Sequence, residues 1–384
     1  MAEQSTLQKV ISFWASLRLS CVLFFLLFLL TVLGTLDQKN LGLYETQKKY
    51  FESLYVIYKI GPLPILLPGV YLVLIFLFIN LIVGTLKRIP FKPSKYGIYI
   101  IHFSMVLLFA GSFVTFKFSD DGHMTLQEGE TSSKFVSYHD WEIAVIDINQ
   151  TDHHLEYIFD INFSHQNVGL KFSDSNLPFT FEILTSDRNA FVQRKGPMLS
   201  TDRDVINGYF ITPLDRDPEN EKNLPSLLLN VTDKNNQSQK VILSGVTEIK
   251  DSLQLQFDDK NWVLSLRRKS WALPFAITLD RVERDLYPGT MQAQAYKSYI
   301  RKIEDNTEEK KEVYMNHPLR HKGYIFFQSG YMEDPNTNIK ASTFAVVQNP
   351  TDQVPLYACI LIGIGMTVHF GGLLLKFIER TSAK

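Results

Sequence analysis

The chain contains very little cysteine. Its 384 residues include only two, Cys21 and Cys359, and these lie in separate apolar runs where we expect them at opposite depths of a membrane. Thiols placed that way are too far apart for a disulfide bond. Since there is no C-x-x-C pair, the chain is neither a thioredoxin-like reductant nor a cytochrome that attaches haem through C-x-x-C-H. We also find no internal repeat, low-complexity tract or Gly-rich phosphate loop, and expect no nucleic-acid partner.

Charge is missing from four segments of 18 to 22 residues, although 21% of the whole chain is charged. These uncharged runs are residues 19–36, 65–86, 96–116 and 356–375. A helix that rises about 1.5 Å per residue crosses a hydrocarbon core of roughly 30 Å with a run of this length. The sequence therefore predicts a membrane protein with three N-terminal transmembrane helices and one C-terminal one, the first being a retained helix and not a signal peptide.

Between the third and fourth runs the sequence becomes mixed and strand-like. Short segments rich in apolar, aromatic and β-branched residues alternate with turn-forming clusters. These segments are residues 141–148, 180–184, 227–231, 253–257, 262–266, 324–328 and 343–347. They predict a large antiparallel β-rich domain, built as a sandwich or as paired sheets. His153 and His154 lie within it, but neighbouring positions of a strand point to opposite faces, so we expect no metal site there.

Basic residues near the ends of the runs predict the orientation. They gather in three segments: Lys9 and Arg18 before the first run, Lys87, Arg88, Lys92 and Lys95 between the second and third, and Lys376, Arg380 and Lys384 after the fourth. Cytoplasmic segments are enriched in Lys and Arg. We therefore expect an interfacial helix at 1–18, three spans in 19–116, an extracytoplasmic domain at 117–355, and a last span with a cytoplasmic tail at 356–384. Both termini then lie in the cytoplasm.

His102 is the only titratable side chain inside the third run, apart from tyrosine, and ionisable groups at lipid depth are functional candidates. It lies seven positions after Lys95, and His369 lies seven before Lys376, so both are expected about 10 Å inside the cytoplasmic boundary. Two neutral imidazoles at one depth can bind haem iron, and the cations at 87–95 can meet its propionates. The alternative is that each histidine bonds to a neighbouring helix or lines a polar cavity. In the second run, Asn80 is expected to form hydrogen bonds between helices.

Residues 316–331 form a second unusual segment. Here His317, Arg320 and His321 precede a turn at Lys322 and Gly323, and an aromatic strand follows. A hairpin with a core strand explains the apolar half of this segment. It leaves the density of histidine and cation unexplained.

Four stretches together resemble the ResB (CcsB-type) family of the cytochrome c biogenesis machinery called System II. They are IIHFSMVLLFAG around His102, LGTLDQKNLGLYETQKKYF at the exit of the first run, TLDRVERDLYPGTMQAQAYKSYI at 278–300, and NHPLRHKGYIFFQSGY at 316–331. Their order along the chain matches the family. Residues from about 120 to 270 carry no motif of it.

The resemblance implies a partner, a ResC (CcsA) membrane subunit with a Trp-rich outer loop, since the four Trp residues of this chain are scattered. The pair would carry non-covalent haem b across the bacterial cytoplasmic membrane and join it to the reduced thiols of apocytochrome c. The chain would be part of a holocytochrome c synthase and no enzyme alone. A separate thiol reductant would be needed because this chain lacks outer cysteines.

In the family the histidine of the third span is an axial haem ligand, a role that falls on His102, and the companion ligand comes from the partner. His317, Arg320 and His321 are then expected to contact haem or apocytochrome at the outer face. Two other interpretations remain open. The chain is a stand-alone b-type haem protein with His102 and His369 as ligands, or it is a membrane-anchored receptor or assembly factor whose histidines are structural.

Overall fold

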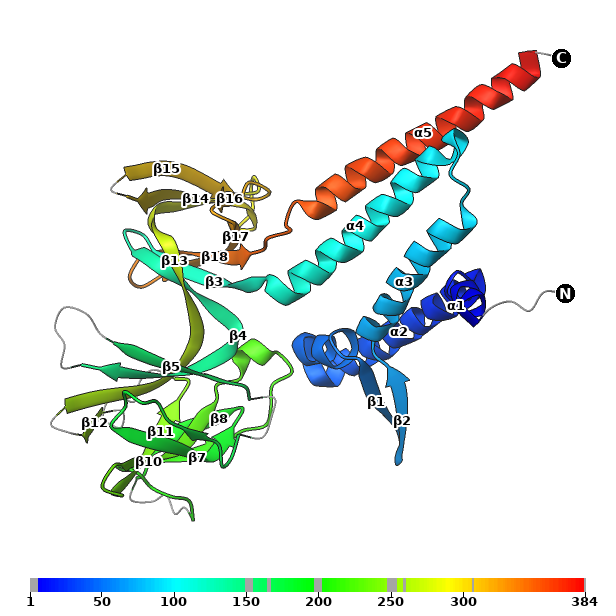
Figure 1. The fold of residues 1–384 in the computed structure, drawn as a ribbon. Coiled ribbons are helices and arrows are strands. Elements are labelled where there is room, and N and C mark those ends of the chain that lie inside the picture. Colours follow the sequence, from blue (N-terminus) through cyan, green and yellow to red (C-terminus); the bar gives the residue numbers. More distant parts are fainter. Residues whose placement is uncertain are drawn as a thin grey trace. The chain divides into compact units, whose positions relative to one another are not determined.

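The computed structural model describes residues 6–148, 155–163, 167–196, 202–246, 254–257, 260–305 and 307–382. The chain divides into two compact units, one made of residues 1–120 and 348–384 and the other of residues 121–347. The first unit is helical (Figure 1). Its elements are α1 (Thr6–Trp14), α2 (Leu17–Thr46), β1 (Tyr55–Ile60), β2 (Leu63–Pro68), α3 (Val70–Arg88), α4 (Tyr96–Phe118) and α5 (Val354–Ser382), with a π-helical turn at Gln47–Phe51 and a 3-10 turn at Pro93–Lys95.

Four helices of the described chain are long and apolar enough to cross a bilayer. They are Leu17–Phe51, which is α2 with its π-helical turn, α3, Pro93–Phe118, which is α4 with its 3-10 turn, and α5. Their mean hydropathy over an 18-residue window lies between 1.9 and 2.6, and 11–22% of each window is buried, as is typical of helices that face lipid. The chain is a membrane protein, as its uncharged runs predict.

The second run differs from the prediction at its start. A spanning helix was expected from residue 65, but α3 begins at Val70 and residues 65–68 belong to β2. Strand β2 pairs antiparallel with β1, so that Ile65 lies opposite Tyr58 and Leu67 opposite Val56. Val56 is buried among the side chains of α2 and α3. Pro68 ends the hairpin because it fixes φ and lacks a backbone N–H, and the helix starts two residues later.

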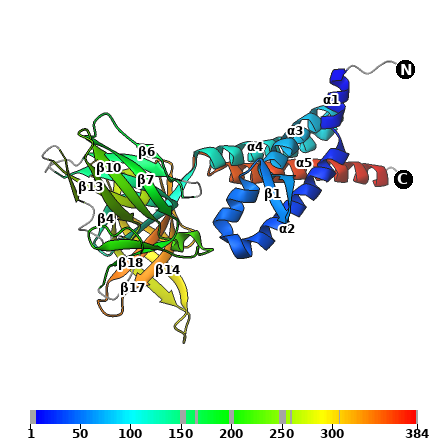
Figure 2. The same cartoon turned by 90° about the horizontal axis from the view of Figure 1, so that it is seen from below.

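Helices α4 and α5 pack antiparallel over their length (Figures 1 and 2). Glycine allows the close approach: a Cβ atom on Gly97 would lie 2.6 Å from both the Gly365 carbonyl oxygen and the His369 nitrogen. Near the other end of the pair, the Thr115 and Thr351 hydroxyls are 2.7 Å apart. The α4 and α5 backbones are therefore in contact near Gly97, and a hydrogen bond between two hydroxyls connects the two segments near Thr115.

The second unit is antiparallel β (Figure 2). Its strands are β3 (Asp120–Gln127), β4 (Thr131–Asp147), β5 (Glu156–Ile161), β6 (Lys171–Phe172), β7 (Phe179–Asp187), β8 (Ala190–Arg194), β9 (Tyr209–Pro213), β10 (Ser226–Asp233), β11 (Ser238–Ser244), β12 (Gln254–Phe257), β13 (Lys260–Leu286), β14 (Ala293–Glu304), β15 (Thr307–Tyr314), β16 (Leu319–His321), β17 (Tyr324–Glu333) and β18 (Lys340–Gln348). A 3-10 turn occupies Asn220–Lys222.

Two sheets carry most of these strands. One has the order β11-β10-β7-β6, and the larger has the order β15-β14-β13-β4-β3-β18-β17-β16, with β5 added to β4 and β12 to β13. The long strands β4 and β13 serve two hydrophobic cores. Trp262 and Leu264 of β13 are buried in the first core with β7 and β10, whereas Ile277 and Leu279 are buried in the second with β17 and β18. Register shifts in β13 between these pairs mark where the strand passes from one core to the other.

The predicted strands are confirmed, since each of the seven segments overlaps a strand of this unit. The prediction of antiparallel β structure is likewise confirmed by the strand registers. His153 and His154 lie outside the described residues.

Candidate functional site

His102 lines a pocket of about 200 Å³ in the helical unit. The pocket lies where the α1–α2 corner and the helices α2, α3 and α4 meet. Besides His102 and Phe109 from α4, it is lined by Asn80, Gly84 and Arg88, which repeat at helical spacing along one face of α3. Of the described residues that line it, none belongs to α5.

The His102 ring is held by its own helix. Its Nδ1 lies 2.9 Å from the Ile98 carbonyl oxygen. A carbonyl oxygen only accepts hydrogen bonds, so this contact requires a proton on Nδ1 and leaves the lone pair of the neutral ring on Nε2. The Nε2 edge faces away from the α4 backbone. This is the arrangement by which proteins fix a histidine as a metal ligand.

The pocket is polar at one end and aromatic at the other. Phe78 of α3 and Phe109 of α4 have ring centroids 6.0 Å apart, which sets the register of the two helices. Arg88 lies ten residues along α3 from Phe78, about 15 Å away, and His102 lies seven residues along α4 from Phe109, about 10 Å away. A ligand in this pocket therefore meets Phe109 at one end, the imidazole in the middle and a guanidinium at the other.

Gly84 leaves one wall of the pocket without a side chain. A Cβ atom placed on it would have no atom within 4 Å. Next to it, the predicted role of Asn80 is confirmed: its amide donates to the Trp14 carbonyl oxygen at 2.6 Å, and its side-chain oxygen accepts from the Ser20 hydroxyl at 2.7 Å. Hydrogen bonds of Asn80 thus connect α3 to the α1–α2 corner at one wall of the pocket.

The structure does not bring His369 to the same level as His102, as the sequence analysis expected. His369 contacts Gly97, and Gly365 contacts Ile101, so the two histidines are offset by about five residues, or about 7.5 Å along the helices. They also lie on different faces of the bundle, because the face of α4 that meets α5 is not the face that lines the pocket. Distances counted from basic residues at the span ends miss this offset, since long cationic side chains reach the interface from several depths.

His321 belongs to an ion-pair cluster of the β unit. Its Nε2 lies 2.7 Å from Glu304 Oε2, and its ring packs edge-on against Phe275. The Lys322 ammonium also pairs with Glu304. Hydrogen bonds from Lys322 and His321 lower the pKa of Glu304 to about 2. The sequence alone does not explain why histidines and cations are concentrated in this segment. For His321 the structure gives a reason, because its ring pairs with the Glu304 carboxylate.

His317 and Arg320 are exposed in the same segment. The His317 ring stacks on Tyr314 with centroids 4.4 Å apart, and Arg320 lies in β16 opposite Ile325 of β17. The predicted turn is confirmed, since Lys322 and Gly323 both have positive φ, at 47° and 82°, as a two-residue hairpin turn requires.

The β unit also contains a histidine cluster that was not predicted from the sequence. His123 stacks on Tyr138 with ring centroids 4.9 Å apart, and its Nδ1 is buried without a hydrogen-bond partner among the described residues. Burial lowers the pKa of His123, and the charge of Arg268 adds to this. Burial likewise lowers the pKa of His139, which faces Glu221 at 3.6 Å. No spacing signal marks these residues, because β3 and β4 bring them together.

Comparison with known proteins identifies the family. The ResB-like family model matches residues 235–360, which include both of the resembling stretches of the β unit. Residues 235–360 thus match the ResB-like family, which confirms the resemblance predicted from the sequence. This ResB-like chain is also similar to Protein NrfI of Wolinella succinogenes, with 21% identity over 286 residues that make up 74% of this chain and 27% of that protein. The chain therefore spans about a quarter of that relative's length.

Among solved structures, the ResB-like chain matches the inhibitor of motility MotI/DgrA of Bacillus subtilis. The match has 8% identity and a TM-score of 0.12, and covers 60% of this chain and 97% of that one. A likeness of this strength carries no argument about the fold. Within the described residues, no group of three or more His, Cys, Asp or Glu side chains is placed to hold a metal ion.

Proposed function

We propose that this ResB-like chain is the haem-handling membrane subunit of a cytochrome c synthase complex. The match to the family and the similarity to NrfI support a role in cytochrome c maturation. The His102 pocket supports the more specific role of receiving haem. The chain acts with a ResC/CcsA-type partner and is not a synthase alone.

The observation that carries the proposal is the pairing of an oriented imidazole with a guanidinium in one pocket. His102 offers Nε2 to the iron, because Nδ1 donates to the Ile98 carbonyl oxygen. Arg88 offers charge-assisted hydrogen bonds to a propionate. Gly84 leaves room for a flat macrocycle beside α3. At about 200 Å³ the pocket is smaller than most sites that enclose a small molecule, which favours a site completed by the partner.

The basic link between α3 and α4 supports the orientation of the complex. Lys87, Arg88, Lys92 and Lys95 occur there without an acidic residue, and such segments lie in the cytoplasm. In this proposal haem enters from the cytoplasm at the end of the pocket near Arg88. The helices cross the bacterial cytoplasmic membrane four times, both termini lie in the cytoplasm, and the β unit faces the outside.

On the outer side, the β unit meets apocytochrome c, whose thiols a separate reductant keeps reduced. The exposed residues His317 and Arg320 are the contacts we propose there, for the apoprotein or for arriving haem. His321 is a weaker candidate, since Glu304 already engages its Nε2. It supports the turn that presents its two neighbours.

The experiment is a haem spectrum of the purified complex of the chain with its partner. Complexes with wild-type chain, His102→Ala and His369→Ala are compared by haem content and Soret absorbance. We expect His102→Ala to lose most of the bound haem, because it removes an iron ligand. His369→Ala is the matched control, a second membrane histidine outside the pocket, and should keep its haem.

Three outcomes contradict the proposal. Haem that remains in the His102→Ala complex assigns the ligand elsewhere. Haem that the lone chain holds and loses on His369→Ala supports a stand-alone b-type haem protein instead. A complex without haem in any preparation supports an assembly factor with structural histidines.

A further inference from the structure

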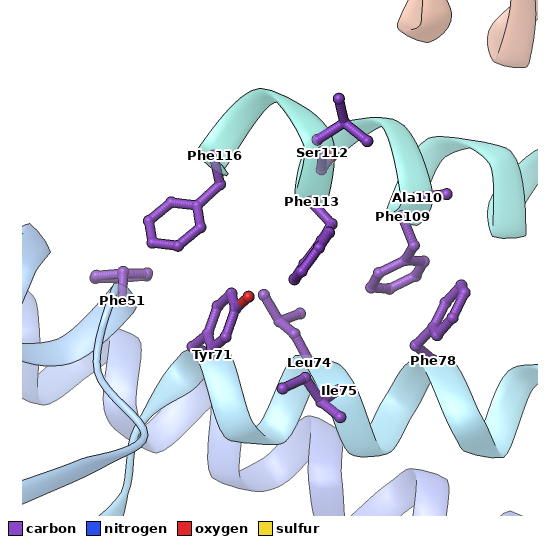
Figure 3. Close-up of a pocket in the computed structure, with 11 residues that line it drawn as sticks. Phe51, Tyr71, Leu74, Ile75, Phe78, Phe109, Ala110, Ser112, Phe113 and Phe116 are labelled. Atoms are coloured by element: carbon purple, nitrogen blue, oxygen red, sulfur yellow. The ribbon is translucent and has the colours of Figure 1, made fainter. Parts of the chain in front are cut away.

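A second, larger pocket lies between α3 and α4, on the other side of Phe109 from His102. It has a volume of about 500 Å³, within the range of sites that bind small molecules. Six aromatic rings line it (Figure 3), those of Phe51, Tyr71, Phe78, Phe109, Phe113 and Phe116. It lies wholly in the helical unit, between two helices of membrane-spanning length.

The lining carries no charge. Among the described residues that form this pocket there is no Asp, Glu, Lys, Arg or His. A charged ligand would therefore lose its hydration at lipid depth without a counter-ion, at a cost of several kcal/mol. The dianionic haem that suits the Arg88 pocket does not suit this one. The chemistry of the lining selects a neutral occupant.

The walls are aromatic to a degree that a saturated hydrocarbon chain does not require. Tyr71 and Phe113 are stacked at 6.2 Å with an angle of 23° between their rings, and Tyr71 and Phe116 lie 5.2 Å apart. Aromatic faces favour a planar conjugated guest that stacks between them. Aliphatic walls such as Leu or Val would hold an acyl chain equally well.

Two of the residues that line this pocket, Tyr71 and Ser112, carry a hydroxyl group. The Tyr71 hydroxyl oxygen lies between the helices near Phe113 and Leu74 (Figure 3), and no hydrogen bond joins it to another described residue. A phenol in an apolar site usually finds an acceptor. A planar guest with a carbonyl oxygen at its edge would supply one.

We propose that this pocket binds the neutral, planar, conjugated ring of a membrane-soluble lipid, the chemistry of an isoprenoid quinone. The ring packs against the aromatic side chains of Tyr71 and Phe113, a ring carbonyl accepts the Tyr71 hydroxyl hydrogen bond, and the tail leaves along the helices into the bilayer. This site goes beyond haem handling and does not depend on it. His102 takes no part in it.

The test is binding of a naphthoquinone with a single isoprene tail to the full-length chain in detergent, measured by equilibrium dialysis. Tyr71→Phe removes only the hydroxyl and should weaken binding about fivefold, the worth of one net hydrogen bond. Phe113→Leu removes a stacking face and keeps the site apolar, with a similar loss. Phe103→Leu is the matched control, because Phe103 lies on the same helix with 62% of its surface exposed, against 51% for Phe113, and lines neither pocket.

Saturable binding that follows this pattern, and that His102→Ala leaves unchanged, supports the proposal. Binding of a saturated fatty acid with the same affinity and no effect of Tyr71→Phe would assign the pocket to lipid acyl chains and overturn it. Haem that binds to the His102→Ala chain and is displaced by the quinone would overturn the argument from charge. Failure to saturate with the quinone overturns the site itself, whatever the haem spectra of the complex show.

Discussion

Replacing Arg88 by Gln tests which end of the His102 pocket holds the propionates. Arg88 is the only charged residue among the described residues that line this pocket, apart from the titratable His102. Gln keeps much of the length and hydrogen-bonding capacity of the side chain but removes its positive charge. If a propionate is bound there, haem loses a charge-assisted hydrogen bond while His102 still ligates the iron.

The expected loss is about fivefold in haem affinity. A hydrogen bond to a charged group is worth roughly 1.5–3 kcal/mol when it is shielded from solvent, whereas an exposed ion pair is worth about 0.2–1 kcal/mol. Arg88 is exposed at the C-terminal end of α3, so we take about 1 kcal/mol. Since about 1.4 kcal/mol is tenfold in a binding constant, the affinity falls about fivefold.

Haem titration of the complex, followed at the Soret band, measures this loss. Lys92→Gln is the control, because Lys92 belongs to the same basic link but does not line the pocket. A second titration uses haem dimethyl ester, whose carboxylates are masked, and there the wild-type and Arg88→Gln complexes should bind equally. An equal loss in Lys92→Gln, or a loss that persists with the ester, would refute a propionate at Arg88.

Two further predictions concern stability. Gly97→Ala places a methyl group 2.6 Å from the backbone of α5, so we expect a loss of about 1–3 kcal/mol in thermal unfolding of the helical unit, whereas Gly363→Ala, whose Cβ meets no atom within 4 Å, should be neutral or better. The lowered pKa of His123 keeps its imidazole neutral in the fold, so stability should fall as the pH drops below about 6.5. His123→Phe keeps a ring on Tyr138 and should reduce this dependence in melts between pH 5 and 7.5, leaving the part that comes from His139. A wild-type melt that is already flat there would contradict the assignment.

The helices could be predicted from the sequence because eighteen or more residues without charge have few other structural solutions. The strands and the turn at Lys322 and Gly323 follow from equally local signals, since alternation and turn chemistry are read within a few residues. The role of Asn80 could also be predicted locally, because a single amide in an apolar helix needs a hydrogen-bond partner. In the structure its partners are the Trp14 carbonyl oxygen and the Ser20 hydroxyl.

What the sequence does not predict depends on how elements meet. Residues 63–68 at the end of the hairpin are uncharged and apolar like the helix that follows, and their pairing with β1, such as Ile65 with Tyr58, makes them a strand. The position of His369 along the helix axis relative to His102 depends on the contact between Gly97 and Gly365. Counting residues from the nearest basic side chain does not reveal this contact. The six aromatic rings of the larger pocket, Tyr71 among them, carry no signal of a pocket in the sequence, and only the packing of α3 against α4 gathers them.

The position of His102 in the helical unit bears on which chain would supply the second ligand of a haem bound there. Helix α4 presents one face to α5, where Gly97 lies against the backbone, and a different face to the pocket that His102 lines. A haem on His102 Nε2 would therefore lie beside α3, and α4 would separate it from α5. His369 would be displaced from it by about five residues along the helix axis. The pocket, at about 200 Å³, would enclose only part of a haem. If His102 holds haem as proposed, a partner subunit is a better source than α5 for the companion ligand, and haem retention would then be a property of the complex.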